Sequence, residues 1–206
     1  MESLWSPMGI GVLWLVLHSA DYLLTVAAAR LKAQGNLAER VRSGGSMELN
    51  PVFQRAVDQG QWLSRRFVLT LVLGAVLLPA AVAYFDWTAE SLGLPAIGAA
   101  SELLAGALVV TRFAVISVHL QNIALFRRML RVPEASVVQM HYDRGTVMAV
   151  TRARKLEVAS FSTLAALVSG RPFFVGGTVA TLGLVLALVL WERRQGASAS
   201  ASKPSG

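Results

Sequence analysis

Hydrophobic residues follow one another in long, nearly unbroken runs along this chain. They do not alternate with polar residues over short segments, as they do in the half-buried strands of a soluble domain. A helix that crosses the hydrocarbon of a bilayer needs about 20 mostly apolar residues, each rising 1.5 Å. Four runs approach or meet that length, at about residues 8–29, 67–84, 97–120 and 173–191. The pattern therefore predicts an all-α, polytopic membrane protein in which residues 1–194 form a single helical bundle.

A fifth apolar run, residues 156–172, is short for a span and could either cross the membrane or re-enter it. The basic residues favour a crossing. Residues 30–66 and 127–155 carry seven Lys and Arg each, so the positive-inside rule places both loops in the cytoplasm and the N-terminus outside. The basic segment WERRQG after the last run should also lie inside, which requires an odd number of crossings. We expect five transmembrane helices; four, with Arg193 and Arg194 outside, is the alternative.

The two ends of the chain differ in character. The N-terminal MESLWSPMG contains an acid and no Lys or Arg, so the first run is expected to be a retained span rather than a cleaved signal peptide. Residues 195–206 are rich in Ala and Ser and are expected to form a disordered tail. These features predict a multi-pass protein of a plasma membrane, here a bacterial inner membrane.

Two basic segments have the pattern of cytoplasmic amphipathic helices. In residues 50–66, helical spacing puts a set of apolar side chains on one face: Val52, Phe53, Ala56, Val57 and Leu63. Residues 133–155 open with Pro-Glu, a common helix start, and are broken at residues 143–145, where a β-hairpin is the alternative. Packing on the lipid surface is the simplest interpretation of both segments.

Composition supports the membrane assignment. The chain is 54% hydrophobic and only 15% charged, whereas a soluble domain is about 25% charged. The net charge of +7 would suggest nucleic acid in a soluble protein, but these basic residues flank apolar runs. The expected partner is therefore a lipid bilayer with anionic headgroups, and not nucleic acid. The absence of cysteine excludes disulfides, thiolate metal sites and cysteine nucleophiles.

The first span carries polar residues on one stripe: His18, Asp21 and Thr25 lie at i, i+3 and i+7. A charged side chain at the bilayer centre costs at least about 2.5–3.5 kcal/mol, so Asp21 should face protein. Arg112 and His119 lie seven residues apart in the third span. At 1.5 Å per residue, Asp21 and Arg112 both lie about 20–24 Å below the outer surface. The matched depth predicts an Asp21–Arg112 ion pair with His18 and His119 near it.

This polar cluster has several possible roles. The ion pair could fix the register of two helices and do nothing else, or Arg112 could extend toward the cytoplasmic headgroups. A metal site built from His18, Asp21 and His119 is a sharper alternative, since nitrogen and oxygen ligands suit zinc. No HExxH motif is present, no catalytic residue can be assigned, and the sequence identifies no cofactor.

The segment GGSMELNPVFQ, residues 44–54, contains a second local signal. Asn50-Pro51 is typical of a turn that starts a helix, and Glu48 is expected on the cytoplasmic rim. Together with Asp21-x3-Thr25, the motif Glu48-x-Asn50-Pro51 resembles a family of uncharacterised small prokaryotic membrane proteins with the pattern D-x3-T … E-x-N-P. The resemblance covers the first third of the chain. It implies that these five residues form one site, and it implies no particular activity.

Three functions are compatible with these features. The first is an accessory or scaffold subunit of a larger membrane complex, favoured by the small size and by small residues at four-residue spacing that permit close helix packing. These pairs are Ser101 with Ala105, Gly176 with Ala180, and Gly183 with Ala187. The second is a proton, ion or small-solute transporter or channel that uses the Asp/Arg/His cluster. The third is an intramembrane metal-dependent enzyme. We rank them in this order.

Overall fold

A computed structural model of the chain describes residues 6–35, 37, 41–43, 51–93, 95–131, 140–142 and 144–201. Within these ranges the backbone is helical apart from short turns and two strands of three residues. The helices are α1 (Pro7–Lys32), α3 (Pro51–Asp58), α4 (Arg65–Leu92), α5 (Pro95–Arg131), α6 (Arg144–Ser169) and α7 (Pro172–Ala201). The strands are β1 (Val41–Ser43) and β2 (Met140–Tyr142).

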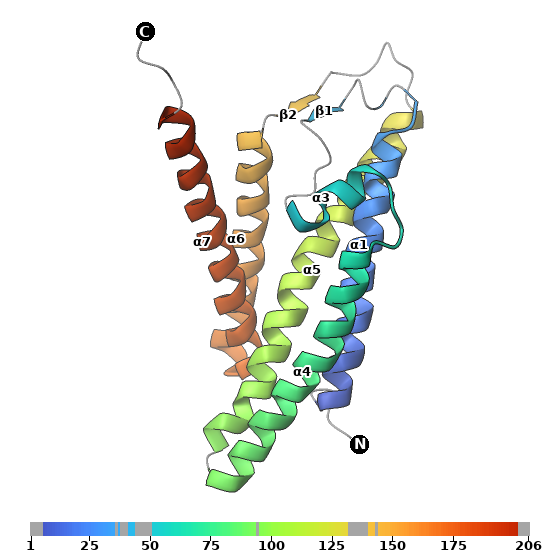
Figure 1. Ribbon diagram of the computed structural model, residues 1–206. Helices are drawn as coiled ribbons and strands as arrows, with labels where there is room; N and C mark the ends of the chain where they lie inside the picture. Colours follow the sequence, from blue (N-terminus) through green and yellow to red (C-terminus); the bar gives the residue numbers. More distant parts are fainter. Residues whose placement is uncertain are drawn as a thin grey trace.

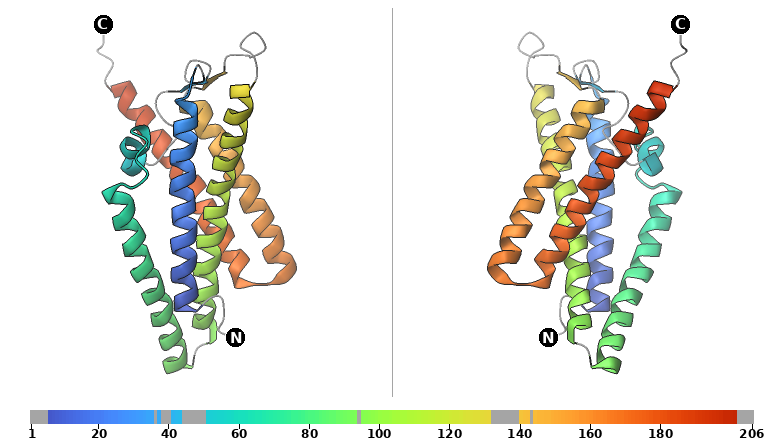
Figure 2. Two further views of the ribbon diagram at one scale, coloured as in Figure 1. Left: turned by 90° about the vertical axis from the view of Figure 1, so that its right-hand side faces the viewer. Right: turned by 90° about the vertical axis from the view of Figure 1, so that its left-hand side faces the viewer.

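The five long helices run alternately up and down along one common direction (Figure 1). The N-terminal end of α1 and the turn between α4 and α5 lie at one end of the molecule. The two strands, α3 and the end of α7 lie at the other, which we call the strand end. Helices α1, α4 and α5 pack on one another, while α6 packs on α7 and only lightly on α5. The two further views show α7 crossing the bundle obliquely (Figure 2).

Four helices in the described part of the chain are long and apolar enough to cross a membrane. They are α1, α4, Ala99–Arg131 of α5 and Pro172–Trp191 of α7. These helices contain the four long apolar runs of the sequence. Four such helices are characteristic of a multi-pass membrane protein. They extend past the predicted bounds because the flanking polar residues also favour helix. Helix α4, for example, ends only at Leu92, where Gly93 adopts a left-handed conformation with φ of 62°.

Helix α6 differs from the expectation. The sequence predicted a cytoplasmic helix within 133–155, broken at 143–145, and a separate span at 156–172. The structure has one continuous helix from Arg144 to Ser169 instead. No proline or glycine occurs between Gly145 and Gly170, so nothing interrupts the helix at residue 155. The alternative of a β-hairpin is wrong, because β2 pairs in parallel with β1, with Val41 opposite Met140.

Helix α3 is shorter than the predicted amphipathic helix of residues 50–66. It ends at Asp58, and Gly60 follows with φ of 63°. Leu63 therefore lies outside the helix and is 72% exposed, so its placement on the apolar face was wrong. The face that remains packs on protein: Val57 is buried, and the ring of Phe53 lies 5.8 Å from that of Tyr22. At the other end of the chain, α7 continues to Ala201, so residues 195–201 of the expected disordered tail are helical.

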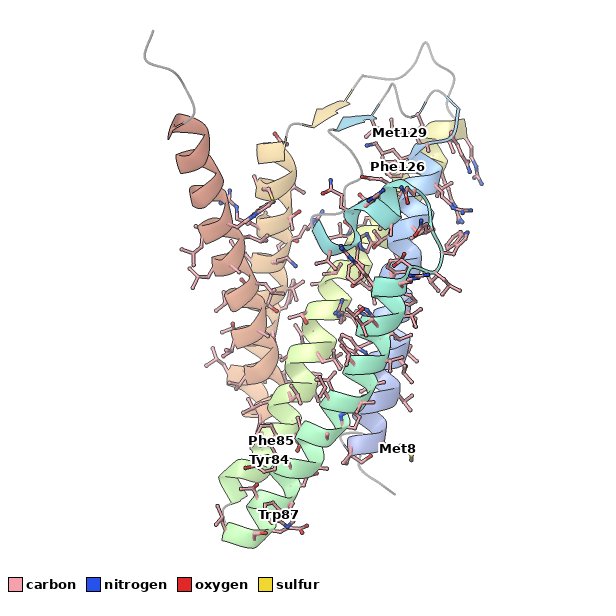
Figure 3. The ribbon with its side chains drawn as sticks, in the orientation of Figure 1. Met8, Tyr84, Phe85, Trp87, Phe126 and Met129 are labelled. Carbon is pink, nitrogen blue, oxygen red and sulfur yellow. The ribbon has the colours of Figure 1, made fainter. Side chains whose placement is uncertain are left out.

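The buried apolar side chains form three clusters along the bundle. Ile10, Val82 and Ala105 pack near the N-terminal end. Tyr22, Val26, Val57 and Phe67 pack where α3 meets α1 and α4. A third cluster joins α1, β1 and α5 at the strand end, where Figure 3 labels Phe126 and Met129; its other members are Ala28, Leu37, Val41 and Ile123. The polar side chains described below lie between the first and third clusters.

Helices α5 and α7 cross at backbone contact. A Cβ atom built on Gly106 would lie 1.7 Å from the carbonyl oxygen of Phe173, and one on Gly176 would lie 2.0 Å from that of Leu103. The expected close packing of small residues therefore occurs at Gly176. It does not occur at Gly183, which has no neighbouring atom within 4 Å of such a Cβ among the residues that the structure describes.

The two glycines of α7 give a matched test of this crossing. Gly176→Ala should lower the free energy of unfolding by about 1–3 kcal/mol, because a methyl group there forces two backbones apart. Gly183→Ala should be neutral or slightly stabilising, since the added methyl group meets open space and alanine favours helix. Reversible denaturation in mixed micelles measures both. Equal stability of the two variants would contradict the crossing.

Candidate functional site

The carboxylate of Asp21 joins α1 to α5. Nη1 of Arg112 donates a hydrogen bond to Asp21 Oδ2, and Nε2 of His119 lies 3.2 Å from Asp21 Oδ1. The Asp21 side chain is only 15% exposed and that of His119 only 13%. The pairing of Asp21 with Arg112 is the one that matched depth predicts. Both oxygens of the acid thus have partners on the neighbouring helix.

Thr25 connects the same two helices one turn further along α1. Its hydroxyl donates to the backbone oxygen of Asp21 at 2.8 Å, and its oxygen lies 2.8 Å from Nε2 of His119. Because the threonine proton is already given to Asp21, the imidazole must donate to the hydroxyl oxygen. The N–H at Nε2 of His119 is therefore shared between Thr25 and the Asp21 carboxylate.

His18 lies on a different side of α1 from the ion pair. Its Nε2 is 3.0 Å from Oγ1 of Thr70 on α4, and its ring stacks on Trp14 at 4.5 Å. Residues three apart on a helix are rotated by about 60° from each other, so a stripe with His18 and Asp21 faces two neighbours at once. His18 still lies near the ion pair, as expected, because it interacts electrostatically with Asp21 and Arg112. Trp14 lies between the two groups. The Arg112 guanidinium lies over that indole, 5.1 Å from its centroid.

The tautomer of His18 follows from its partner. Thr70 donates its hydroxyl proton to backbone oxygens of its own helix, those of Arg66 and Phe67, both at 3.0 Å. It must therefore accept from Nε2 of His18. Nδ1 is buried with no hydrogen-bond partner within the described ranges. A proton on Nδ1 would have no acceptor there, so the neutral ring with its proton on Nε2 is the form that fits this packing among aromatic side chains.

Trp14, which the sequence analysis did not single out, closes the cluster toward α4. Its Nε1 donates to the carbonyl oxygen of Leu71 at 2.9 Å. The indole lies flat against Gly74, where a Cβ atom would come within 2.1 Å of Cε2. Its position four residues before His18 places Trp14 close to the polar stripe, and this spacing could have indicated its role. Nothing in the sequence predicts that its indole packs on Gly74.

Lys155 of α6 also belongs to this cluster. It is half-buried, and it interacts electrostatically with both Asp21 and Arg112. Lys155 was not predicted here because the change of polarity at residue 155 resembles the end of a cytoplasmic segment. Only the continuity of α6 brings this lysine to the level of the ion pair.

The three candidate metal ligands do not converge. His18 faces α4, while Asp21 and His119 face each other beside Arg112. In the part of the chain that the structure describes, no group of three His, Asp or Glu side chains could hold a metal ion. Of the motif at residues 48–51, Glu48 and Asn50 lie outside the described residues, and Pro51 begins α3. The implied joint site with Asp21 and Thr25 stays a prediction.

Comparisons with protein-family models, curated proteins and solved structures found no match to this chain. The resemblance to the small prokaryotic membrane proteins therefore stays an expectation from the sequence.

A double-mutant cycle tests the Asp21–Arg112 tie. Either Asp21→Ala or Arg112→Ala alone should cost about 3–5 kcal/mol of stability, because each leaves a charge in an apolar surrounding without its partner. The double variant should recover part of that loss, with a coupling of at least about 1 kcal/mol. Denaturation in mixed micelles provides the free energies.

Asp86 provides the control for this cycle. It accepts a hydrogen bond from Ser101 at 2.7 Å near the other end of the bundle. Asp86→Ala combined with Arg112→Ala should be additive. If the losses of stability from Asp21→Ala and Arg112→Ala were also additive, the Asp21–Arg112 pair would contribute no coupling energy.

Proposed function

We propose that the protein crosses a plasma membrane five times, with its N-terminus outside, and serves as an accessory or scaffold subunit of a larger membrane complex. The Asp21–Arg112–His119 cluster would act in it as a fixed tie between α1 and α5. The proposal has two parts, a placement in the bilayer and a role, and each rests on different residues.

Side chains of α4 support the placement. Arg66 lies near its beginning, and the exposed aromatic residues Tyr84 and Trp87 lie toward its far end (Figure 3). Arg66 and Trp87 are 21 positions apart, which corresponds to about 32 Å along a helix and is close to the thickness of about 30 Å of a hydrocarbon core. Arginine at one boundary and aromatic rings at the other are typical of a spanning helix. The strand end, which carries the basic loops, is then cytoplasmic.

Contacts between α1 and α4 support a depth for the cluster. The ring of Tyr22 stacks on that of Phe67, with centroids 4.2 Å apart, directly after Arg66 in the chain. Asp21 is therefore within about one helical turn, some 5 Å, of the level of Arg66. The ion pair belongs to the cytoplasmic side of the hydrocarbon rather than to its centre.

Helix α6 is the crossing that needs the most support. Its apolar part, residues 156–169, spans only about 21 Å. The exposed Leu167 and Val168 precede a turn at Gly170, and α7 then runs back along α6 to the strand end (Figure 1). Local thinning of the bilayer and extension of exposed Arg171 toward the outer headgroups would accommodate the short span.

One observation carries the proposed role: both oxygens of Asp21 are engaged by groups of the same chain, Arg112 and His119. An acid bound in this way holds two helices in register, as a rigid subunit requires. The open face at Gly183 of α7 is the small-residue face left for a helix of another subunit.

The absence of native cysteine makes the topology directly testable. Single cysteines at exposed Gln59, Ser91 and Ser169 should react with a membrane-impermeant thiol reagent in intact cells only at positions 91 and 169. Gln59→Cys should react only after permeabilisation, because it belongs to the cytoplasmic end. If Ser169→Cys reacts from neither side, α6 does not cross the membrane and is a re-entrant helix instead.

Copurification in mild detergent tests the role. A subunit should retain a membrane partner at fixed stoichiometry, and Gly183→Leu should release it because the larger side chain blocks close helix approach. The Gly183→Ala variant is the matched control and should retain more of the partner. A chain that purifies alone from its native membrane, with or without these changes, would contradict the subunit role.

A further inference from the structure

Side chains of α1 hold the connection between α3 and α4, residues 59–64, in a defined conformation. Nε and Nη2 of Arg30 donate hydrogen bonds to the carbonyl oxygen of Gly60, at 3.0 and 2.7 Å. The hydroxyl of Tyr22 donates to the carbonyl oxygen of Gln61 at 2.9 Å. Gly60 has a positive φ of 63°, and a Cβ atom there would lie 3.1 Å from Nε of Arg30. Three hydrogen bonds and a close backbone approach therefore fix this turn against α1.

The fixed turn presents two large apolar side chains at the surface. Trp62 is 43% exposed and Leu63 is 72% exposed. The guanidinium of Arg30 covers one face of the indole, with its Cζ 4.7 Å from the ring centroid. Ordering a turn costs conformational entropy, yet here the ordered backbone exposes a Trp-Leu pair instead of burying it. Such an exposed apolar pair on a rigid support is typical of an interaction surface.

The position of the turn indicates what it meets. Figure 1 shows the connection from α3 to α4 at the side of the bundle, beside the first turn of α4. Leu63 directly precedes Ser64, the N-cap of α4, so it lies about one helical turn, some 5 Å, before Arg66. In the proposed placement Arg66 marks the edge of the hydrocarbon core, and the headgroup layer beyond that edge is about 5–8 Å thick. The turn is then at the level of the headgroups, where tryptophan is enriched.

The charges beside the turn complement an anionic membrane surface. Arg65 and Arg66 follow it directly, and both are exposed. Nη1 of Arg66 also donates to the carbonyl oxygen of Val52 at 3.1 Å, which holds α3 beside the same turn. Residues 51–66 carry three arginines and one acid, Asp58. Arginine beside exposed tryptophan and leucine is the combination with which proteins bind the surface of an anionic bilayer.

We propose that the turn of residues 60–63 anchors the bundle in the headgroup layer of the cytoplasmic leaflet. Trp62 and Leu63 enter this layer, and Arg65 and Arg66 bind the phosphates of anionic phospholipids. The contact with lipid comes from this turn and not from the apolar face of α3, which packs on protein. The proposal rests on the placement of α4 in the bilayer and is independent of the subunit role.

The absence of native cysteine allows a direct measurement of depth. Spin labels at Leu63→Cys and at exposed Gln59→Cys, the matched control, are compared in the full chain reconstituted into vesicles of phosphatidylcholine and phosphatidylglycerol. Collision with oxygen, which concentrates in lipid, is measured against collision with a water-soluble nickel chelate. The ratio of the two should be at least about threefold higher at position 63, because that side chain lies below the membrane surface.

Two results would overturn the anchor. Equal ratios at positions 63 and 59 would place Leu63 in water. Loss of collision with both reagents at position 63 would show a protein surface, such as a second copy of the chain, in place of lipid. The side from which Gln59→Cys reacts with the impermeant thiol reagent tests the topology separately, so a failed anchor and a wrong topology give different results.

Arg30 is the positioning residue of the anchor, because it holds Gly60 and covers the indole of Trp62. Arg30→Gln should lower the collision ratio at position 63 at least about twofold. Arg55→Gln, which removes the same charge from an exposed position of α3, should leave the ratio unchanged. Equal falls for the two variants would overturn the positioning role and leave a general effect of charge.

The lipid composition tests the two arginines after the turn. Vesicles of phosphatidylcholine alone should lower the ratio at position 63, since their surface carries no net charge to attract Arg65 and Arg66. An unchanged ratio in these vesicles would overturn the binding of anionic headgroups.

Discussion

The bond between Asp21 and Arg112 is the contact on which the arrangement of α1 and α5 depends. In hydrocarbon, an acid without a partner costs several kcal/mol, whereas apolar side chains gain little by preferring one helix face over another. The pair therefore supplies specificity that the apolar surfaces lack. His119 and Thr25 extend it by one turn, so the two helices are fixed in rotation as well as in depth.

The same constraint explains how much of the site could be predicted from the sequence. A charged residue in a span needs a partner at its own depth, and Arg112 is the basic residue at the depth of Asp21. Depth alone does not say which way a neighbouring residue faces. His18 matches Asp21 in depth, but its rotation of about 60° around α1 directs it to Thr70 on α4.

The errors in the fold have a related cause. Polarity divides residues 133–172 into two segments near residue 155, but the helix continues through that point. Hydrogen bonding along the backbone does not depend on whether the side chains are basic or apolar. Gly170, with its left-handed conformation, and not Lys155, marks the end of α6. The long runs of α1, α4, α5 and α7 were predictable because each of them lies within one helix, although α4, α5 and α7 continue past the apolar run.

The continuity of α6 also gives the polar cluster its composition. Helix α6 has a basic first half and a more apolar second half, and Lys155 lies where these halves meet. At this position Lys155 interacts electrostatically with Asp21 and Arg112, which the division of the chain at residue 155 had hidden. Further into the hydrocarbon, a second cation beside Arg112 would be too costly to keep charged; further out, water would screen it. In the proposed placement, a lysine beside Arg112 keeps its charge only in the boundary layer between hydrocarbon and water.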